Sequence, residues 1–235
     1  MERQLAFGGI LGETAAAIAG AAAYVVALIV ALAGLGIAGQ MGGAVNPDQL
    51  WGFGFTYEDD TTALGLAAAL AQLVVQFVGC YFVLARMLQV RGHLTAGGTR
   101  IWAYVGLSIV TGIAIMFGLV LLIVPGVILL VRWSAAPGYL IGRGTGVGEA
   151  MSKSWDATRG HSWPIFFAGL VLLVVFIGAA VVIGLGSDLA GSATIGEIVA
   201  GSIIEAVMTA VSLAFSAAVF MLLDRDVEKF DEVFA

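Results

Sequence analysis

Residues 164–185, PIFFAGLVLLVVFIGAAVVIGL, carry no charge and, after Pro164, no polar side chain. The run matches the roughly 20 residues that an α-helix needs to cross a bilayer. Of the 235 residues, 60% are hydrophobic and only 11% are charged, and the mean hydropathy is +1.04. A soluble domain carries about 25% charged residues, and a membrane β-barrel alternates apolar and polar positions. We therefore expect an all-α, polytopic integral membrane protein with a helical bundle.

Similar apolar runs predict six transmembrane segments within a single membrane domain over residues 1–235. Pro125-Gly126 separates the third run from the fourth, and a Pro-Gly pair breaks helices, so we expect a tight hairpin there. The fourth run is short, so it forms either a complete span or half of a re-entrant pair. The expected spans are 14–37, 62–85, 101–124, 126–141, 164–185 and 195–223.

Basic residues occur in every second loop of this six-span arrangement, and so on one side of the membrane. The loops after the first, third and fifth spans contain no Lys or Arg, and Arg132 is the one basic residue inside a span. By the positive-inside rule, both termini are expected in the cytoplasm. The opposite loop, 40–60, is acidic and aromatic, includes the solvated pair Asp59-Asp60, and is expected at the outer interface. The expected cytoplasmic basic residues are Arg3, Arg86, Arg91, Arg100, Arg143, Lys153, Arg159, Arg225 and Lys229.

One expected cytoplasmic loop, residues 146–160, has the period of an amphipathic helix. We expect this helix to lie in the headgroup plane, with Trp155, Lys153 and Arg159 as interfacial anchors. Its less polar face comprises Val147, Ala150, Met151, Ser154, Trp155 and Thr158, and its charged face comprises Glu149, Lys153, Asp156 and Arg159.

Two charged residues, Arg132 and Glu205, lie inside the predicted spans and away from their ends, where charge is costly and marks a functional hypothesis. At a rise of about 1.5 Å per residue, both lie at similar depths from the outer side. We expect a buried Arg132–Glu205 ion pair that fixes helix packing. Two alternatives stay open: Arg132 binds an anionic headgroup or solute, or it extends its side chain to the interface.

Polar side chains also recur at helical spacing inside the predicted spans. They line one face of the sixth span, and a smaller set lies in the second and third spans. Such faces serve interhelical packing or line a polar cavity for a solute. An alanine stripe on the first span is a packing surface, within the chain, for a homo-oligomer or for a membrane partner. The polar positions are Ser202, Glu205, Thr209, Ser212, Ser216, Gln72, Gln76, Ser108 and Thr111, and the stripe is Ala15, Ala19, Ala23, Ala27 and Ala31.

Catalytic and metal-binding signatures are absent from the sequence. His93 and His161 are single loop histidines without metal-ligand spacing, and we interpret them as solvated residues. Cys80 lies in an apolar run, where a buried structural role is expected. The sequence contains no nucleophile, P-loop or zinc-protease motif and no basic patch for nucleic acid. We therefore expect no cofactor, no metal and no nucleic-acid partner.

A central segment carries a recognisable set of motifs. Its residues are Pro125-Gly126, Arg132, Ala136-Pro137, Glu149-Ala150, Ser154-Trp155, Thr158-Arg159-Gly160 and Trp163. The segment resembles the membrane domain of glycerophosphoryl diester phosphodiesterases and of related stand-alone bacterial inner-membrane proteins; Gly138 departs from the pattern. In the fused proteins the chemistry belongs to a separate soluble barrel, absent from these residues. The resemblance therefore implies a bacterial inner-membrane location without that activity.

Three functional classes follow from these observations. The first is a non-catalytic module that binds membrane lipids or assembles with membrane partners. The second is a solute or lipid transporter, with a polar path lined by the sixth, second and fourth spans. The third, a membrane-embedded lipid-modifying enzyme, has the least support because no nucleophile-base or metal cluster is present.

Overall fold

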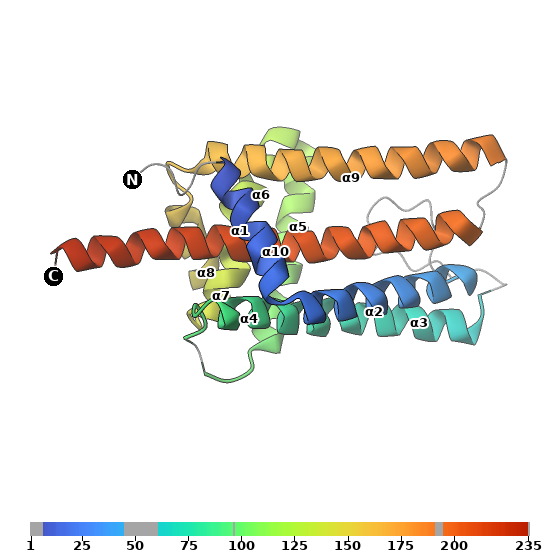
Figure 1. Ribbon diagram of the computed structural model, residues 1–235, viewed down its shortest axis with the longest axis horizontal. Coiled ribbons are helices and arrows are strands. Elements are labelled where there is room, and N and C mark those ends of the chain that lie inside the picture. The colour runs from blue at the N-terminus through green and yellow to red at the C-terminus, as the bar shows by residue number, and fades with distance from the viewer. Residues whose placement is uncertain (1–6, 45–60, 96, 191–194, 235) are drawn as a thin grey trace. The chain divides into compact units, whose positions relative to one another are not determined.

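The computed structural model describes residues 7–44, 61–95, 97–190 and 195–234, in which all regular secondary structure is helical (Figure 1). Six stretches are long and apolar enough to span a membrane, which confirms the predicted helical membrane class. Most of the predicted outer loop, including Asp59-Asp60, lies outside the described residues, as do Arg3 and the side chains of Arg225 and Lys229. The six stretches are Ala22–Met41, Ala63–Val90, Ile101–Leu121, Ile123–Gly142, Ser162–Val182 and Ile195–Asp224.

The helices divide into two compact units, called unit 1 and unit 2 below. Unit 2 contains α2 (Ala22–Met41), α3 (Ala63–Val74) and the π-helical turn η1 (Val75–Gly79). It also contains the part of α9 (Ser162–Ala190) that begins at Leu173 and the part of α10 (Ile195–Phe234) that ends at Ala210. The remaining described residues form unit 1. Its helices are α1 (Phe7–Gly20), α4 (Cys80–Val90), α5 (Ile101–Leu121), α6 (Ile123–Arg132), α7 (Ala136–Gly142), α8 (Val147–Ala157), the first part of α9 (Ser162–Ala190) and the last part of α10 (Ile195–Phe234).

In unit 2, α2 and α3 approach each other closely through two glycines. A Cβ on Gly65 would lie 2.5 Å from the carbonyl oxygen of Gly42, so neither position accepts a side chain without a shift of backbone. Thr62 begins α3, because its hydroxyl accepts a hydrogen bond from the Gly65 N–H at 3.0 Å. The Thr62 N–H in turn donates to the Gly42 carbonyl at 2.9 Å, which ties the two helix ends together.

In unit 1, α5 and α6 form a hairpin with one non-helical residue between them. Leu122 has extended backbone angles (φ −158°, ψ 124°), so the break precedes the predicted Pro125-Gly126 position. Pro125 instead occupies the first turn of α6, where its missing N–H leaves no intrahelical hydrogen bond unmade. The helices pack closely at two glycines, since a Cβ on Gly118 would lie 2.8 Å from the Gly126 Cα.

The stretch expected as a fourth span, 126–141, is not one regular helix. It contains α6, a short turn and α7, most of which is buried. Phe220 of α10 packs directly on Gly138, and its ring meets Tyr139 edge-on with centroids 4.9 Å apart. A glycine is therefore required at position 138 because the Phe220 side chain fills the space that a Cβ would take.

The first apolar run is also divided, so the span begins at Ala22 and not at residue 14. The helix is interrupted by a turn at Ala21. An ion pair between Glu13 and Arg91 at 3.3 Å joins α1 to α4 and the segment that follows it, within unit 1. The predicted alanine stripe is thereby shared between α1 and α2. Ala15, Ala19, Ala23 and Ala27 are exposed and Ala31 is half-buried.

We expect Gly138→Ala to destabilise the protein by about 1–3 kcal/mol, because the new methyl group would clash with Phe220. Thermal unfolding of the detergent-solubilised protein, followed by tryptophan fluorescence, measures the change. Gly148→Ala in α8 is the matched control, since nothing lies within 4 Å of its Cβ. Equal stability of the two variants would contradict the observed packing.

Candidate functional site

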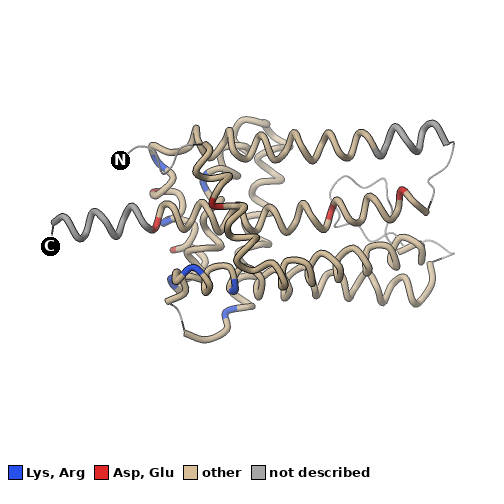
Figure 2. Tube along the Cα trace, viewed as in Figure 1, with Lys and Arg blue, Asp and Glu red and all other residues tan. Residues whose placement is uncertain are grey.

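Every lysine and arginine with a described side chain lies in unit 1 (Figure 2). Most of these cations have an acidic partner within the same unit. Unit 1 therefore uses charge mainly to join its own segments. The pairs are Arg91–Glu13 at 3.3 Å, Arg143–Asp224 at 2.7 Å, Lys153–Glu149 at 2.8 Å and Arg159–Asp156 at 3.8 Å.

Arg132, in the last turn of α6, is held differently from these paired cations. Its Nη1 donates to the Trp155 carbonyl at 3.3 Å, and its guanidinium carbon lies 5.3 Å from the centroid of the Trp155 ring. Within the described residues of unit 1 it has no carboxylate partner and no second hydrogen-bond acceptor. The half-buried guanidinium thus combines an aromatic platform with N–H groups available to an anion.

Helix α8 contacts Arg132 through both its backbone and its side chains. The Ser154 hydroxyl donates to the Arg132 carbonyl at 2.7 Å, and Ser154 is fully buried. Ala150 and Thr158 are buried on the same face, which confirms the predicted division of α8 into two faces. Trp155 is half-buried against Arg132 and Trp133; its role as a membrane anchor stays a prediction, as do those of Lys153 and Arg159.

The opposite face of α8 is charged and exposed. Glu149 and Lys153 form an i, i+4 pair, and the hydrogen bond and charge of Lys153 lower the pKa of the Glu149 carboxyl. Asp156 and Arg159 are also exposed. Four charged groups on one face are costly in hydrocarbon, so this face of α8 must meet water or lipid headgroups. We therefore expect Arg132 to lie close to the membrane surface on the side of α8.

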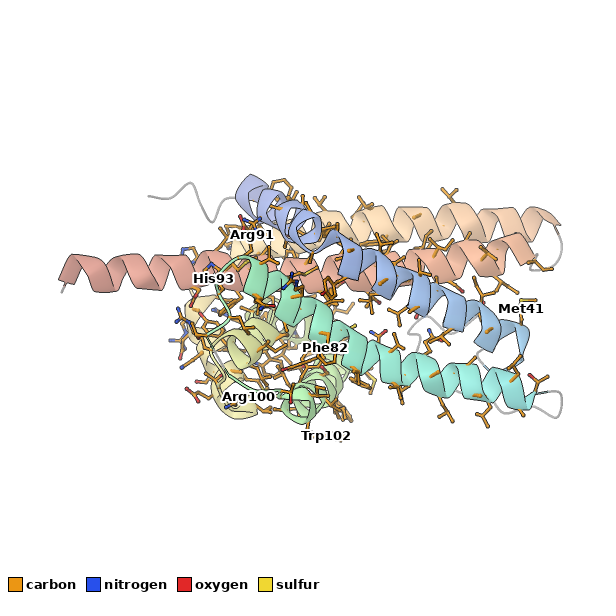
Figure 3. All side chains as sticks on the ribbon, turned by 60° about the horizontal axis from the view of Figure 1, so that its bottom comes forward. Met41, Phe82, Arg91, His93, Arg100 and Trp102 are labelled. Atoms are coloured by element: carbon orange, nitrogen blue, oxygen red, sulfur yellow. The ribbon has the colours of Figure 1, made fainter. Side chains whose placement is uncertain are left out.

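A second cluster joins three distant segments of unit 1 at Asp224. His93 Nδ1 lies 2.9 Å from Oδ2 of Asp224, while Arg143 donates to Oδ1 from Nε at 2.9 Å and from Nη2 at 2.7 Å. The interpretation of His93 as a solvated loop residue was wrong: it is 9% exposed, and Figure 3 shows it in the segment between α4 and α5. No local signal identifies this cluster, because His93 and Asp224 are 131 residues apart.

His161, the other predicted loop histidine, is half-buried rather than fully solvated. Its Nδ1 is buried and has no hydrogen-bond partner in the described part of the chain. Its backbone N–H donates to the Thr158 carbonyl at 3.2 Å, at the turn between α8 and α9. Cys80 is buried, and the described residues contain no group of three His, Cys, Asp or Glu side chains arranged to hold a metal ion.

In unit 2, polar side chains from three helices converge on Gly36 of α2. A Cβ at this position would lie 3.3 Å from the Ser202 hydroxyl oxygen and 3.6 Å from Gln72 Nε2. Gln40 Nε2 donates to the same hydroxyl at 3.4 Å. The structure thus brings together two predicted residues, Gln72 and Ser202, and adds Gln40, which was expected in the outer loop but lies in α2.

The amides of Gln72 and Gln76 keep most of their hydrogen-bonding capacity. Neither side chain forms a hydrogen bond with any residue that the structure describes, and both are half-buried. Gln76 lies in η1, and π-helical turns inside α-helices frequently mark functional sites. Unpaired amides within a membrane span favour water or a small polar solute nearby, because hydrocarbon offers no partner.

The polar face predicted along α10 is not uniform. Ser202 is 2% exposed, Thr209 is half-buried, and Glu205 and Ser212 are exposed. Ser216 donates to the Ser134 carbonyl at 2.7 Å, whereas Ser108 and Thr111 of α5 bond to carbonyls of their own helix. Arg132 belongs to unit 1 and Glu205 to unit 2, and their ion pair stays a prediction.

We expect Asp224→Asn to lower the free energy of unfolding by about 3 kcal/mol or more, because it leaves Arg143 beside a neutral, partly mismatched acceptor. Denaturant unfolding in mixed micelles measures this. Asp156→Asn removes the same charge from an exposed pair and should change stability by less than about 0.5 kcal/mol. Similar values for the two variants would show that the Asp224 cluster does not hold unit 1 together.

Comparison with known proteins adds no relative to these observations. No family model, curated protein or solved structure matches the chain. The resemblance to the phosphodiesterase membrane domain stays a prediction.

Proposed function

We propose that this protein is a non-catalytic, multi-pass membrane protein that binds an anionic lipid headgroup at Arg132 and Trp155. The observation that carries the proposal is that the Arg132 guanidinium has a ring and one carbonyl as partners, and no carboxylate in the described part of unit 1. Guanidinium groups present a planar set of donors that suits phosphate oxygens. Trp155 supports the guanidinium from one face and leaves its edge for the ligand.

The distribution of charge supports an anionic membrane surface as the source of the ligand. All cations with described side chains belong to unit 1, and Lys153 and Arg159 lie on the exposed face of α8. By the positive-inside rule we place this end, with both termini, in the cytoplasm of a bacterial cell. The cytoplasmic leaflet is negatively charged, and each basic residue near it contributes about 1 kcal/mol of attraction.

We expect wild-type protein to retain phosphatidylglycerol in native mass spectrometry, and Arg132→Ala to bind it about tenfold or more weakly, since a hydrogen bond to a charged group contributes about 1.5–3 kcal/mol. Arg132→Lys should recover only part of the affinity, because an ammonium group lacks the planar set of donors. The titration uses phosphatidylglycerol against phosphatidylcholine in the same detergent.

Arg159→Ala is the matched control for net charge, since Arg159 is exposed and loosely paired at 3.8 Å. It removes only general charge attraction, so it should weaken phosphatidylglycerol binding less than Arg132→Ala does. Equal losses for Arg132→Ala and Arg159→Ala would point to general charge attraction and overturn a specific headgroup site.

The Gly36 cluster of unit 2 favours a second candidate function, passage of a small uncharged polar solute. The unpaired amides of Gln72 and Gln76 carry this alternative, and the cluster holds no carboxylate that would attract a divalent cation. Glycerol and urea are suitable probes, because each exchanges hydrogen bonds with amide groups as water does.

If the cluster lines a path, proteoliposomes will swell faster than protein-free vesicles in a glycerol or urea gradient. Gln72→Leu should then return the rate to the protein-free value, whereas Gln89→Leu, at an exposed position of α4, should not. Stopped-flow light scattering gives both rates. Wild-type vesicles that swell no faster than protein-free ones would exclude these solutes and leave the cluster a packing contact.

A further inference from the structure

The α5–α6 hairpin has arms of unequal length, and the shorter arm limits how deep it reaches. Helix α6 has 10 residues, so at about 1.5 Å per residue it is about 15 Å long. The hydrocarbon core of a bilayer is about 30 Å thick. Helix α6 alone therefore covers at most about half of the core, and less when it is tilted.

The base of α6 is fixed near the membrane surface. Its last residue, Arg132, accepts a hydrogen bond from Ser154 at 2.7 Å and donates one to the Trp155 carbonyl at 3.3 Å. Both partners belong to α8, whose outer face carries exposed charged groups and so must meet water or headgroups. The tip of the hairpin, one α6 length away, lies no deeper than about the middle of the bilayer.

The composition of the tip suits hydrocarbon. Leu122 and its neighbours are apolar and protrude, with Val120 78% and Ile123 73% exposed. The Leu122 N–H donates to the Gly118 carbonyl at 3.0 Å, and its carbonyl accepts from the Gly126 N–H at 3.4 Å. The turn thus forms two internal backbone hydrogen bonds, of the kind that lipid requires. Nothing charged or aromatic marks the tip as a point that reaches the opposite interface.

The longer arm, α5, must then lie strongly inclined. It has 21 residues and is about 31 Å long. It begins at Arg100, whose Nη1 donates to the Thr145 carbonyl just before α8, so its start lies on the same side of the membrane as Arg132. A helix of this length that descends only about 15 Å cannot stand upright. Within unit 1, Figures 1 and 3 show α5 running across the direction of the last part of α10.

We propose that the α5–α6 hairpin is a wedge that enters one leaflet from the side of α8 and contacts the acyl chains of that leaflet alone. Four helical stretches, α2, α3 to α4, α9 and α10, then cross the membrane. The wedge displaces lipid from one leaflet and not from the other, which makes it a contact for loosely packed or curved membrane surfaces. It does not depend on a headgroup bound at Arg132.

Cysteine labelling in sealed vesicles tests the wedge. In a Cys80→Ala background, Leu122→Cys is treated with a membrane-impermeant maleimide from outside, and then from both sides after the reagent is trapped inside. Gly97→Cys, in the exposed segment before α5, marks the α8 side of the membrane. A wedge leaves Leu122→Cys unlabelled from both sides, whereas a spanning hairpin exposes it on the side opposite Gly97→Cys.

A spin label at the same cysteine gives a positive readout of depth. The wedge predicts that the label at residue 122 is accessible to oxygen, inaccessible to a water-soluble nickel complex, and no deeper than about the bilayer centre, 15 Å from the α8 side. Val120→Cys provides a second tip position if Leu122→Cys fails to fold. Labelling from the side opposite Gly97→Cys, or a depth beyond the centre, would overturn the proposal.

Discussion

The carboxylate of Asp224 is the point at which unit 1 is held together. His93 approaches one oxygen and Arg143 donates twice to the other, so a nearly buried negative charge has charged or polar partners on both sides. His93 comes from the segment before α5, Arg143 directly follows α7, and Asp224 lies in the last part of α10. Their meeting places Phe220, one turn earlier in α10, over Gly138. The packing of α7, and through it the position of α8, follows from this contact.

Arg132 owes its properties to that arrangement. Once α8 is seated, Ser154 and Trp155 hold the end of α6, and the guanidinium keeps donors that unit 1 does not use. The same contacts set the level at which the α5–α6 hairpin begins. A headgroup site and a one-leaflet wedge would therefore share one structural support, although each can exist without the other.

The two units handle polarity in different ways. Unit 1 joins its segments with ion pairs, whose desolvation costs little where water and headgroups are close. In unit 2, the cluster around Gly36 is built from neutral amides and a hydroxyl, whose desolvation costs far less than that of a charge. The exposed Glu205 is the one charged residue that interrupts the polar face of α10 in unit 2, and the Arg132 predicted to pair with it belongs to unit 1.

The sequence by itself determined the class of this protein and the character of its helices. Continuous apolar runs predicted five of the six long apolar helical stretches to within about five residues at each end, whereas the first begins at Ala22 and not at residue 14. The 3.6-residue period predicted both faces of α8, because hydropathy and periodicity depend only on neighbouring residues. Only the tertiary structure decided the break at Leu122, the His93–Asp224–Arg143 cluster and the meeting of Gln40, Gln72 and Ser202. Those features depend on which distant residues pack together, and the free energy of such contacts is not encoded in any local pattern.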